Sequence, residues 1–107
     1  MKKMSKEDFQ SKISIDNFID SIWLEQGLSK ATLDAYRSDL SGLEYWTAKK
    51  NITLENISRA DLLDYISERA KNGSSSRSSA RMLSSFRRFY GYLFQQELIN
   101  NNPTEKV

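Results

Sequence analysis

Apolar residues recur at three- and four-residue steps in several segments, which is the spacing of one face of an α-helix. The first such segment starts after Ser14 and ends at Gly27, a residue type that commonly terminates helices. Its apolar positions are Ile15, Phe18, Ile19, Ile22 and Trp23. The pattern predicts a helix over residues 14–26, with Trp23 among the core side chains.

Three serines are predicted to cap helix N-termini, namely Ser14, Ser29 and Ser58. Each has one apolar residue directly before it and a second apolar residue at the fourth position after it. Contact between these two side chains fixes the chain before the helix against the first helical turn. The pairs are Ile13 with Phe18, Leu28 with Leu33, and Ile57 with Leu62. The repeated pattern predicts where three helices begin.

The second and third helices follow from these starts. The second is predicted from Ser29 to about Lys49, with a core stripe of Leu33, Tyr36, Leu40, Leu43 and Thr47 and with Trp46 at its edge. The third follows Ser58, where Asp61 can return a hydrogen bond to the cap, and it ends at Asn72-Gly73. Its expected core positions are Leu62, Leu63, Ile66 and Ala70.

A serine-rich hinge at residues 74–76 leads into a fourth helix, which is expected to reach about Leu98. The segment before Pro103 ends it, since a residue that precedes proline is pushed out of helical geometry. We expect residues 1–12 to be a disordered extension, residues 13–99 to form one four-helix domain, and residues 100–107 to begin a linker. No segment alternates like a strand, so the predicted fold class is all-α.

The fourth predicted helix has one cationic and one apolar face. On a wheel of about 100° per residue, Arg77, Arg81 and Arg88 fall within about 40° of one another. The opposite side collects Met82, Phe86, Phe89, Tyr90 and Leu93. Six basic residues and no acid lie between Glu68 and Glu97, whereas the other ten of the 16 basic residues share the rest of the chain with all 14 acids.

A cationic helix face is often only a solvated surface, and that alternative stays open. Two features favour an anionic ligand instead. An ordinary exposed helix carries acids at i,i+4 to form local ion pairs, and this segment has none. Arginine also fills every charged position of the helix, which favours bidentate recognition of phosphate or guanine.

Small residues form a second unusual surface, on the second helix. Ala31, Ala35, Ser38 and Gly42 project within about 60° of one another and permit close approach by a large partner. Tight packing against a neighbouring helix would explain the same residues equally well.

Composition excludes several classes of chemistry. The chain has neither cysteine nor histidine, so it lacks disulfides, thiolates, the commonest general base and the commonest metal ligand. We therefore expect no catalytic residue, no metal and no cofactor. No apolar run approaches the roughly 20 residues needed to cross a bilayer, and the N-terminus lacks the apolar stretch of a secretory signal. A cytoplasmic location without membrane contact is the resulting expectation.

Two runs of sequence carry a family resemblance. The first is LSKATLDAYRSDL at residues 28–40, with Trp46 after it, and the second is SARMLSSFRRFYGYL at residues 79–93, followed by Asn102-Pro103. In this order and at this separation they resemble the N-terminal domain of the tyrosine recombinase (phage integrase) family. The resemblance is strongest to its Xer-type members and extends from Ile13 to the end of the chain.

The resemblance implies a compact four-helix, SAM-like core-binding domain that forms half of a clamp around a double-stranded DNA recombination half-site. In that family the second and fourth helices face the DNA. Carried over by position, the DNA-facing residues are Ala31, Thr32, Ala35 and Ser38 on the second helix and Arg77, Arg81 and Ser85 on the fourth. Helix geometry adds Arg88 to this set. Ser78 joins it as a residue that could hydrogen-bond phosphate oxygens if the start of the fourth helix faces DNA, and a role in the hinge and helix cap is the alternative.

The resemblance also implies that the residues that cleave DNA belong to a second domain, which would begin after Pro103 and has no counterpart in this chain. The fragment is expected to bind DNA as a monomer without cutting it. The full-length parent would act with a partner recombinase of the XerC type in site-specific recombination and chromosome dimer resolution. An alternative from another class stays open, namely a helical protein–protein interaction module whose basic face meets an acidic partner.

Overall fold

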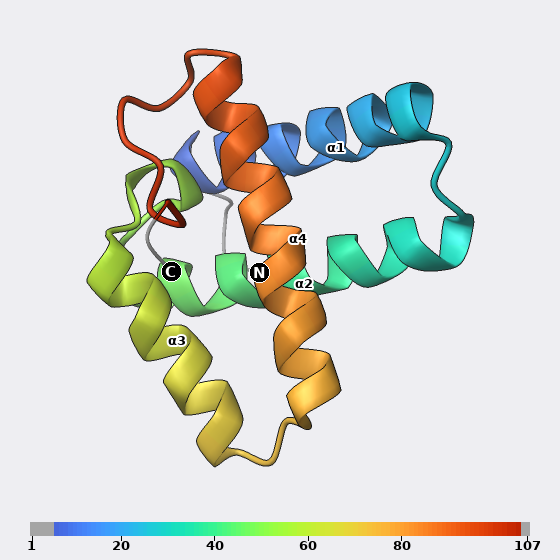
Figure 1. The fold of residues 1–107 in the computed structure, drawn as a ribbon. Helices are drawn as coiled ribbons and strands as arrows, with labels where there is room; N and C mark the ends of the chain where they lie inside the picture. Colours follow the sequence, from blue (N-terminus) through green and yellow to red (C-terminus); the bar gives the residue numbers. More distant parts are fainter. Residues whose placement is uncertain (1–5, 106–107) are drawn as a thin grey trace, which may run out of the picture. The chain divides into compact units, whose positions relative to one another are not determined.

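A computed structural model describes the backbone of residues 6–105 and the side chains of residues 14–105. In chain order it contains α1 (Lys6–Gln26), α2 (Lys30–Lys49), the short 3-10 helix η1 (Leu54–Asn56), α3 (Arg59–Lys71) and α4 (Ser76–Gln95), shown in Figure 1. Residues 6–105 contain no strand. The predicted all-α fold with four α-helices is confirmed. The chain divides into two compact units, one ending at Leu54 and the other beginning at Glu55.

In the first unit, α1 begins at Lys6, eight residues before the predicted start. Ser14 is not an N-cap, because it lies inside the helix and is 2% exposed. Neither proline nor glycine occurs between residues 6 and 26, so nothing in the backbone ends the helix on its N-terminal side. The predicted disordered extension is therefore wrong for residues 6–12, and its residues 1–5 lie outside the described part of the chain.

The buried side of α1 is narrower than predicted. Ile15, Phe18, Ile19 and Ile22 are buried, but Trp23 is 58% exposed. On a helical wheel Trp23 lies about 80° from Ile15, at the edge of the stripe and in the last turn. The helix then stops at Gly27, whose φ of 59° suits glycine and whose N–H donates to the carbonyl of Trp23.

The second helix, α2, packs against α1 and begins as predicted. The Ser29 hydroxyl caps it by accepting a hydrogen bond from the backbone N–H of Thr32 at 3.2 Å. The buried residues of α2 are Tyr36, Asp39, Leu40, Leu43 and Thr47. The guanidinium of Arg37 also forms an ion pair with the carboxylate of Asp16 on α1. Both side chains are substantially exposed, so this pair adds little stability.

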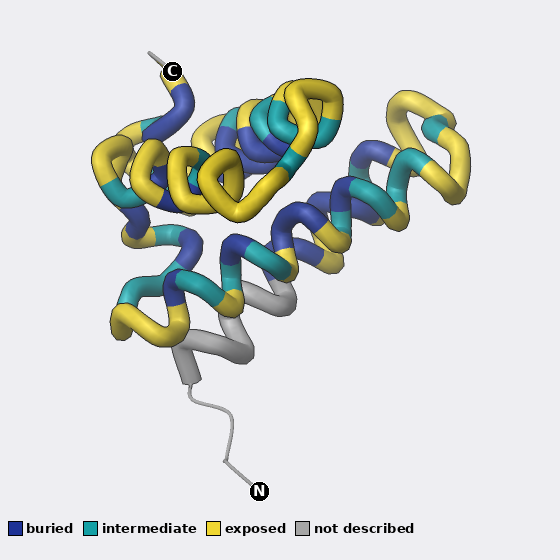
Figure 2. The backbone as a smooth tube through the Cα atoms, turned by 90° about the horizontal axis from the view of Figure 1, so that it is seen from below, coloured by how far each residue is buried: buried dark blue, intermediate teal, exposed yellow. Residues whose placement is uncertain are grey.

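In the second unit, Ser58 and Asp61 form the predicted capping box at the start of α3. The core side of α3 differs from the prediction, since Leu63 is 39% exposed and Ala70 is exposed, while Tyr65 is buried. Leu63 and Ala70 lie about 80–100° from Leu62 on the wheel, whereas Tyr65 lies within about 60° of it. Figure 2 shows how buried and exposed residues alternate along each helix.

Helix α4 packs against α3 and buries the predicted apolar face, namely Met82, Phe86, Phe89, Tyr90 and Leu93. The ring centroids of Tyr65 and Phe86 lie 6.1 Å apart across this contact. The helix ends at Gln95 rather than near Leu98. Glu97 adopts a φ of 60°, and the N–H of Leu98 donates to the carbonyl of Leu93, which closes the last turn.

The segment after α4 is more ordered than expected for a linker. Pro103 and Thr104 are buried. The backbone N–H and the hydroxyl of Thr104 both donate to the side-chain oxygen of Asn102, at 2.9 and 2.6 Å. Up to Glu105, these hydrogen bonds fold the segment that was predicted to begin a linker into a turn.

Candidate nucleic-acid interface

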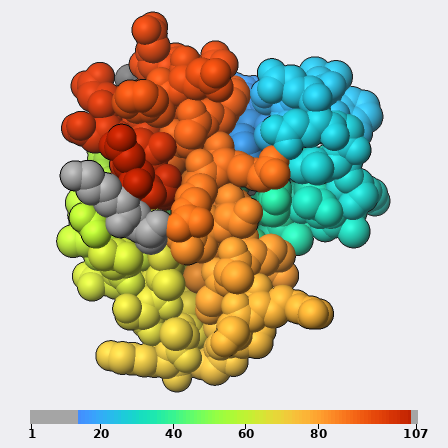
Figure 3. All heavy atoms as spheres, in the orientation of Figure 1, coloured from blue at the N-terminus to red at the C-terminus, as the bar shows by residue number. Residues whose placement is uncertain are grey.

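The cationic face of α4 forms as predicted. Arg77, Arg81 and Arg88 are all exposed, while the apolar residues on the other side of the helix are buried. Figure 3 shows long side chains that project into solvent from the α4 segment, coloured orange. We call Arg77, Arg81 and Arg88 the arginine stripe. Arg87 is also exposed, but it lies about 100° from the centre of the stripe.

The N-terminus of α4 lies at one end of this stripe. The Ser75 hydroxyl accepts a hydrogen bond from the N–H of Ser78 at 3.1 Å and donates to the Ser78 hydroxyl at 3.1 Å. Ser78 is half-buried and belongs to this cap. Arg77 occupies the first turn, so its charge adds to the positive end of the helix dipole.

One residue of the predicted DNA-facing set does not fit. Ser85 has no exposed surface, and its hydroxyl donates to the backbone carbonyl of Met82 at 2.8 Å. On the wheel it lies midway between the arginine stripe and the apolar face, and packing covers it completely. Ser85 is therefore a core residue, and the expectation that it faces DNA is wrong.

On α2, the small residues lie on one face but differ in exposure. Ala31 and Ser38 are exposed, whereas Thr32, Ala35 and Gly42 are half-buried. The hydroxyl of Thr32 accepts a hydrogen bond from the Ser29 hydroxyl at 3.0 Å, so it takes part in the N-cap. The α2 candidates belong to the first unit and the α4 candidates to the second.

At its C-terminal end, α2 carries two aromatic–lysine pairs that were not among the predicted site residues. The ammonium of Lys49 lies 4.3 Å from the centroid of the Tyr45 ring, and that of Lys50 lies 4.8 Å from a ring centroid of Trp46. Such distances are typical of cation–π interactions. The i,i+4 spacing of an aromatic residue and a lysine is the sequence signal that could have indicated them.

Tyr90 lies on the buried side of α4, opposite the arginine stripe. Burial raises the pKa of its phenol well above the usual value, and the nearby negative charge of Glu55 raises it further. The phenol therefore stays neutral at physiological pH and adds no charge to the unit.

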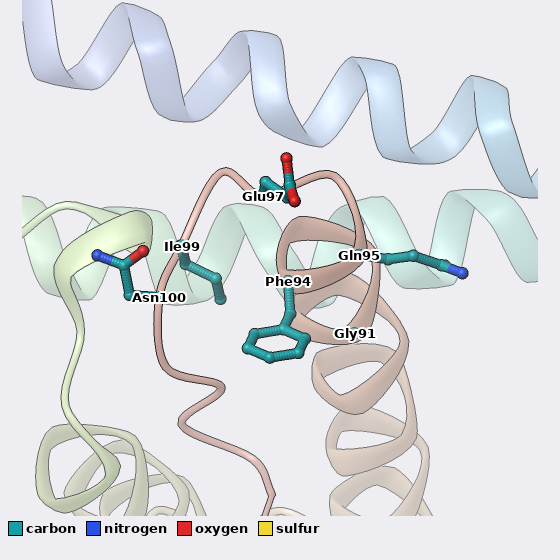
Figure 4. Close-up of a pocket in the computed structure, with 6 residues that line it drawn as sticks. All are labelled: Gly91, Phe94, Gln95, Glu97, Ile99 and Asn100. Atoms are coloured by element: carbon teal, nitrogen blue, oxygen red, sulfur yellow. The ribbon is translucent and has the colours of Figure 1, made fainter.

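A hollow of about 730 Å³ lies at the C-terminal end of α4, lined by Gly91, Phe94, Gln95, Glu97, Ile99 and Asn100. Figure 4 shows the side chains of Phe94 and Ile99 on its walls, one from α4 and the other from the segment that follows. Phe94 is 51% exposed. The described residues include no group of three or more acids that could hold a metal ion, and none of the described helices is long and apolar enough to cross a membrane.

Comparison with known proteins identifies the domain. Residues 15–97 match the family model described as phage integrase, N-terminal SAM-like domain. The chain belongs to this family. This membership confirms the resemblance found in the sequence and makes the four helices a SAM-like domain of the tyrosine recombinases.

Several relatives of this phage integrase domain are named tyrosine recombinase XerD. The chain is 42% identical over 93 residues to the protein from Pseudomonas aeruginosa, 40% over 92 residues to that from Proteus mirabilis, and 37% over 99 residues to that from Shewanella oneidensis. The alignments cover 87%, 86% and 92% of this chain but 31%, 29% and 33% of the relatives. The chain thus spans about a third of the length of these curated relatives.

Proposed function

We propose that this domain binds double-stranded DNA, as the core-binding domain of a Xer-type site-specific tyrosine recombinase. The observation that carries the proposal is the arginine stripe, three exposed arginines on one face of α4 in a segment without acids. Guanidinium groups match the geometry of phosphate and of guanine edges, so a rigid row of them suits a DNA duplex. Membership of a recombinase family supports the same conclusion.

The three arginines are assigned different roles. Arg77 combines its own charge with the N-terminus of α4, which favours a phosphate contact. Arg81 lies one turn further into the helix and is the candidate for reading a base edge, most simply a guanine. Arg88 extends the stripe by two further turns. Ser78 is the further α4 candidate. In the first unit, α2 carries a separate set of proposed DNA-facing residues, namely Ala31, Thr32, Ala35 and Ser38.

For the longer polypeptide, we propose that strand cleavage and joining reside outside the described domain. The relatives named XerD are about three times as long as the matched region. The parent would recombine DNA at a specific site together with a partner of the XerC type, as in chromosome dimer resolution, while the domain alone would bind as a monomer. A DNA suicide substrate incubated with the purified domain should yield no covalent protein–DNA adduct.

The DNA-binding proposal can be tested by titrating labelled cognate and scrambled duplexes at several salt concentrations. Arg77→Ala should weaken binding to both duplexes alike and reduce the slope of log K against log salt by about one. Arg81→Ala should cost about 1–3 kcal/mol on the cognate half-site and little on the scrambled duplex. Arg87→Ala is the matched control, because it removes the same charge from the same helix but outside the stripe.

Unchanged affinity for both duplexes in the Arg77→Ala/Arg81→Ala variant, with its helical circular dichroism intact, would contradict DNA binding by the stripe. The protein–protein interaction module would then be the better explanation of the basic face. If Arg77→Ala and Arg81→Ala each lose only as much affinity as Arg87→Ala, binding depends on the total charge of the helix and not on the stripe.

A further inference from the structure

The C-terminal end of α2 carries a compact group of aromatic and cationic side chains, which we call the α2-end cluster: Tyr45, Trp46, Lys49 and Lys50. Tyr45 is 66% exposed, Trp46 is half-buried, and both lysines are exposed. Each ammonium lies over the ring four residues before it, at 4.3 Å for Lys49 and 4.8 Å for Lys50. Two positive charges are thereby held in defined positions on one helical turn.

Tyr45 and Lys49 of the α2-end cluster continue the face of α2 that is proposed to meet DNA. From Ala31 the positions Ala35, Ser38, Gly42, Tyr45 and Lys49 follow at alternating steps of four and three residues. Ala31 and Lys49 are separated by about five turns and so point in the same direction. The small residues occupy the start of this line, and Tyr45 and Lys49 occupy its end. Trp46 and Lys50 lie beside it, about 60° and 100° around the helix from Ala31.

The usual role of lysines in a last helical turn is to interact with the helix dipole. That role accounts for the positive charges but not for the two aromatic residues beside them, of which Tyr45 is exposed and Trp46 is half-buried. The rings also have a covered face, because an ammonium lies over each of them, which makes them poor platforms for stacking bases. An ammonium over a ring keeps N–H groups that can donate to an anion.

We infer that the α2-end cluster is a phosphate-binding site for the backbone of the DNA duplex. This inference rests on the proposed function and extends it, since it assigns Lys49 and Lys50 as phosphate ligands and Tyr45 and Trp46 as the residues that position them. The acid nearest to the cluster along α2, Glu44, lies about 140° from Lys49 on the helix circumference and does not share its face. Phosphate contacts carry no sequence information, so the site holds cognate and scrambled duplexes alike.

The first test is the salt dependence of duplex binding by Lys49→Ala/Lys50→Ala. Loss of two phosphate contacts should reduce the slope of log K against log salt by about two and weaken binding of both duplexes roughly tenfold or more at about 0.1 M salt. Arg87→Ala, which removes a charge outside both surfaces, should change the slope much less. A loss confined to the cognate duplex would overturn the assignment to phosphate.

A second variant separates the rings from the charges. Tyr45→Leu/Trp46→Leu keeps both lysines and should still weaken binding several-fold, because the ammonium groups lose their fixed positions. Lys49→Arg/Lys50→Arg keeps both charges and the ring contacts and should bind like the unaltered protein. Unchanged affinity in the leucine variant would overturn the positioning role of the rings.

The fluorescence of Trp46 tests whether the DNA binds at the α2-end cluster. In a Trp23→Phe background, Trp46 is the remaining tryptophan, and duplex binding should change its emission and protect it from acrylamide quenching. If Lys49→Ala/Lys50→Ala retains the unaltered slope and Trp46 does not respond, while Arg77→Ala/Arg81→Ala loses affinity, this inference fails and the proposed function stands. If neither pair of substitutions affects duplex binding, both this inference and the proposed function fail.

Discussion

Phe86 offers a direct test of how the second unit is stabilised. Its side chain has no exposed surface, and its ring forms a tilted pair with Tyr65 of α3 at a centroid distance of 6.1 Å. Phe86→Ala should lower the free energy of unfolding by about 3–5 kcal/mol, because it loses buried apolar contacts and leaves a cavity. About 0.5–1.5 kcal/mol of that loss belongs to the aromatic pair.

Phe94 is a matched control on the same helix. It is 51% exposed, so its burial contributes only part of what a fully buried phenylalanine does, and Phe94→Ala should cost about 1 kcal/mol. Both variants remove the same atoms from α4 and change its helix propensity equally. The difference between them therefore reports burial together with the aromatic pair that only Phe86 makes.

Urea unfolding followed by far-ultraviolet circular dichroism measures both losses. Since a domain of this size has a stability of about 5–15 kcal/mol, Phe86→Ala removes a large share of it, and Phe86→Leu provides a milder variant with an intermediate loss. Equal losses in Phe86→Ala and Phe94→Ala, or a loss below about 1 kcal/mol in Phe86→Ala, would refute the assignment of Phe86 to the core.

Two further predictions concern pH and a helix cap. The folded-state pKa of Tyr90 is raised above its unfolded value near 10. The stability that the neutral Tyr90 phenol contributes is therefore complete below the unfolded-state pKa and is lost as the pH rises toward the folded-state pKa. Urea midpoints measured from neutral to alkaline pH should fall above about pH 10, and Tyr90→Phe should remove that component. Ser58→Ala should cost about 0.5–2 kcal/mol in the same assay because the capping box of α3 is lost. Ser67→Ala, at an exposed position inside α3, should cost nothing, since alanine is the better helix former.

The starts of α2 and α3 could be predicted because their causes are local. Ser29 and Ser58 each accept a hydrogen bond from an N–H three residues later, so a short stretch of sequence contains the whole interaction. The two faces of α4 could be predicted for a similar reason. Its apolar and charged residues separate so clearly around the helix that any packing partner would cover the same side.

The sequence predicted the exposure of some DNA-facing candidates but not of all of them. The arginine stripe followed from helical spacing, and its exposure is confirmed. Ser85 is buried although the family resemblance placed it among the DNA-facing positions. It lies at the boundary of the apolar face, where small differences in packing decide exposure. The α2-end cluster depends on side-chain conformations, which place each lysine over an aromatic ring rather than in solvent.

By itself, the sequence determined the all-α class, four helices, two of the caps, the stop at Gly27 and the separation of charge on α4. These features depend on residues within about one or two turns of one another. Only the tertiary structure decided that Trp23 and Leu63 are exposed, that Tyr65 and Ser85 are buried, and that Pro103 and Thr104 are covered. Burial requires a second surface formed by residues distant in the chain, and no local pattern specifies how far that surface extends around a helix.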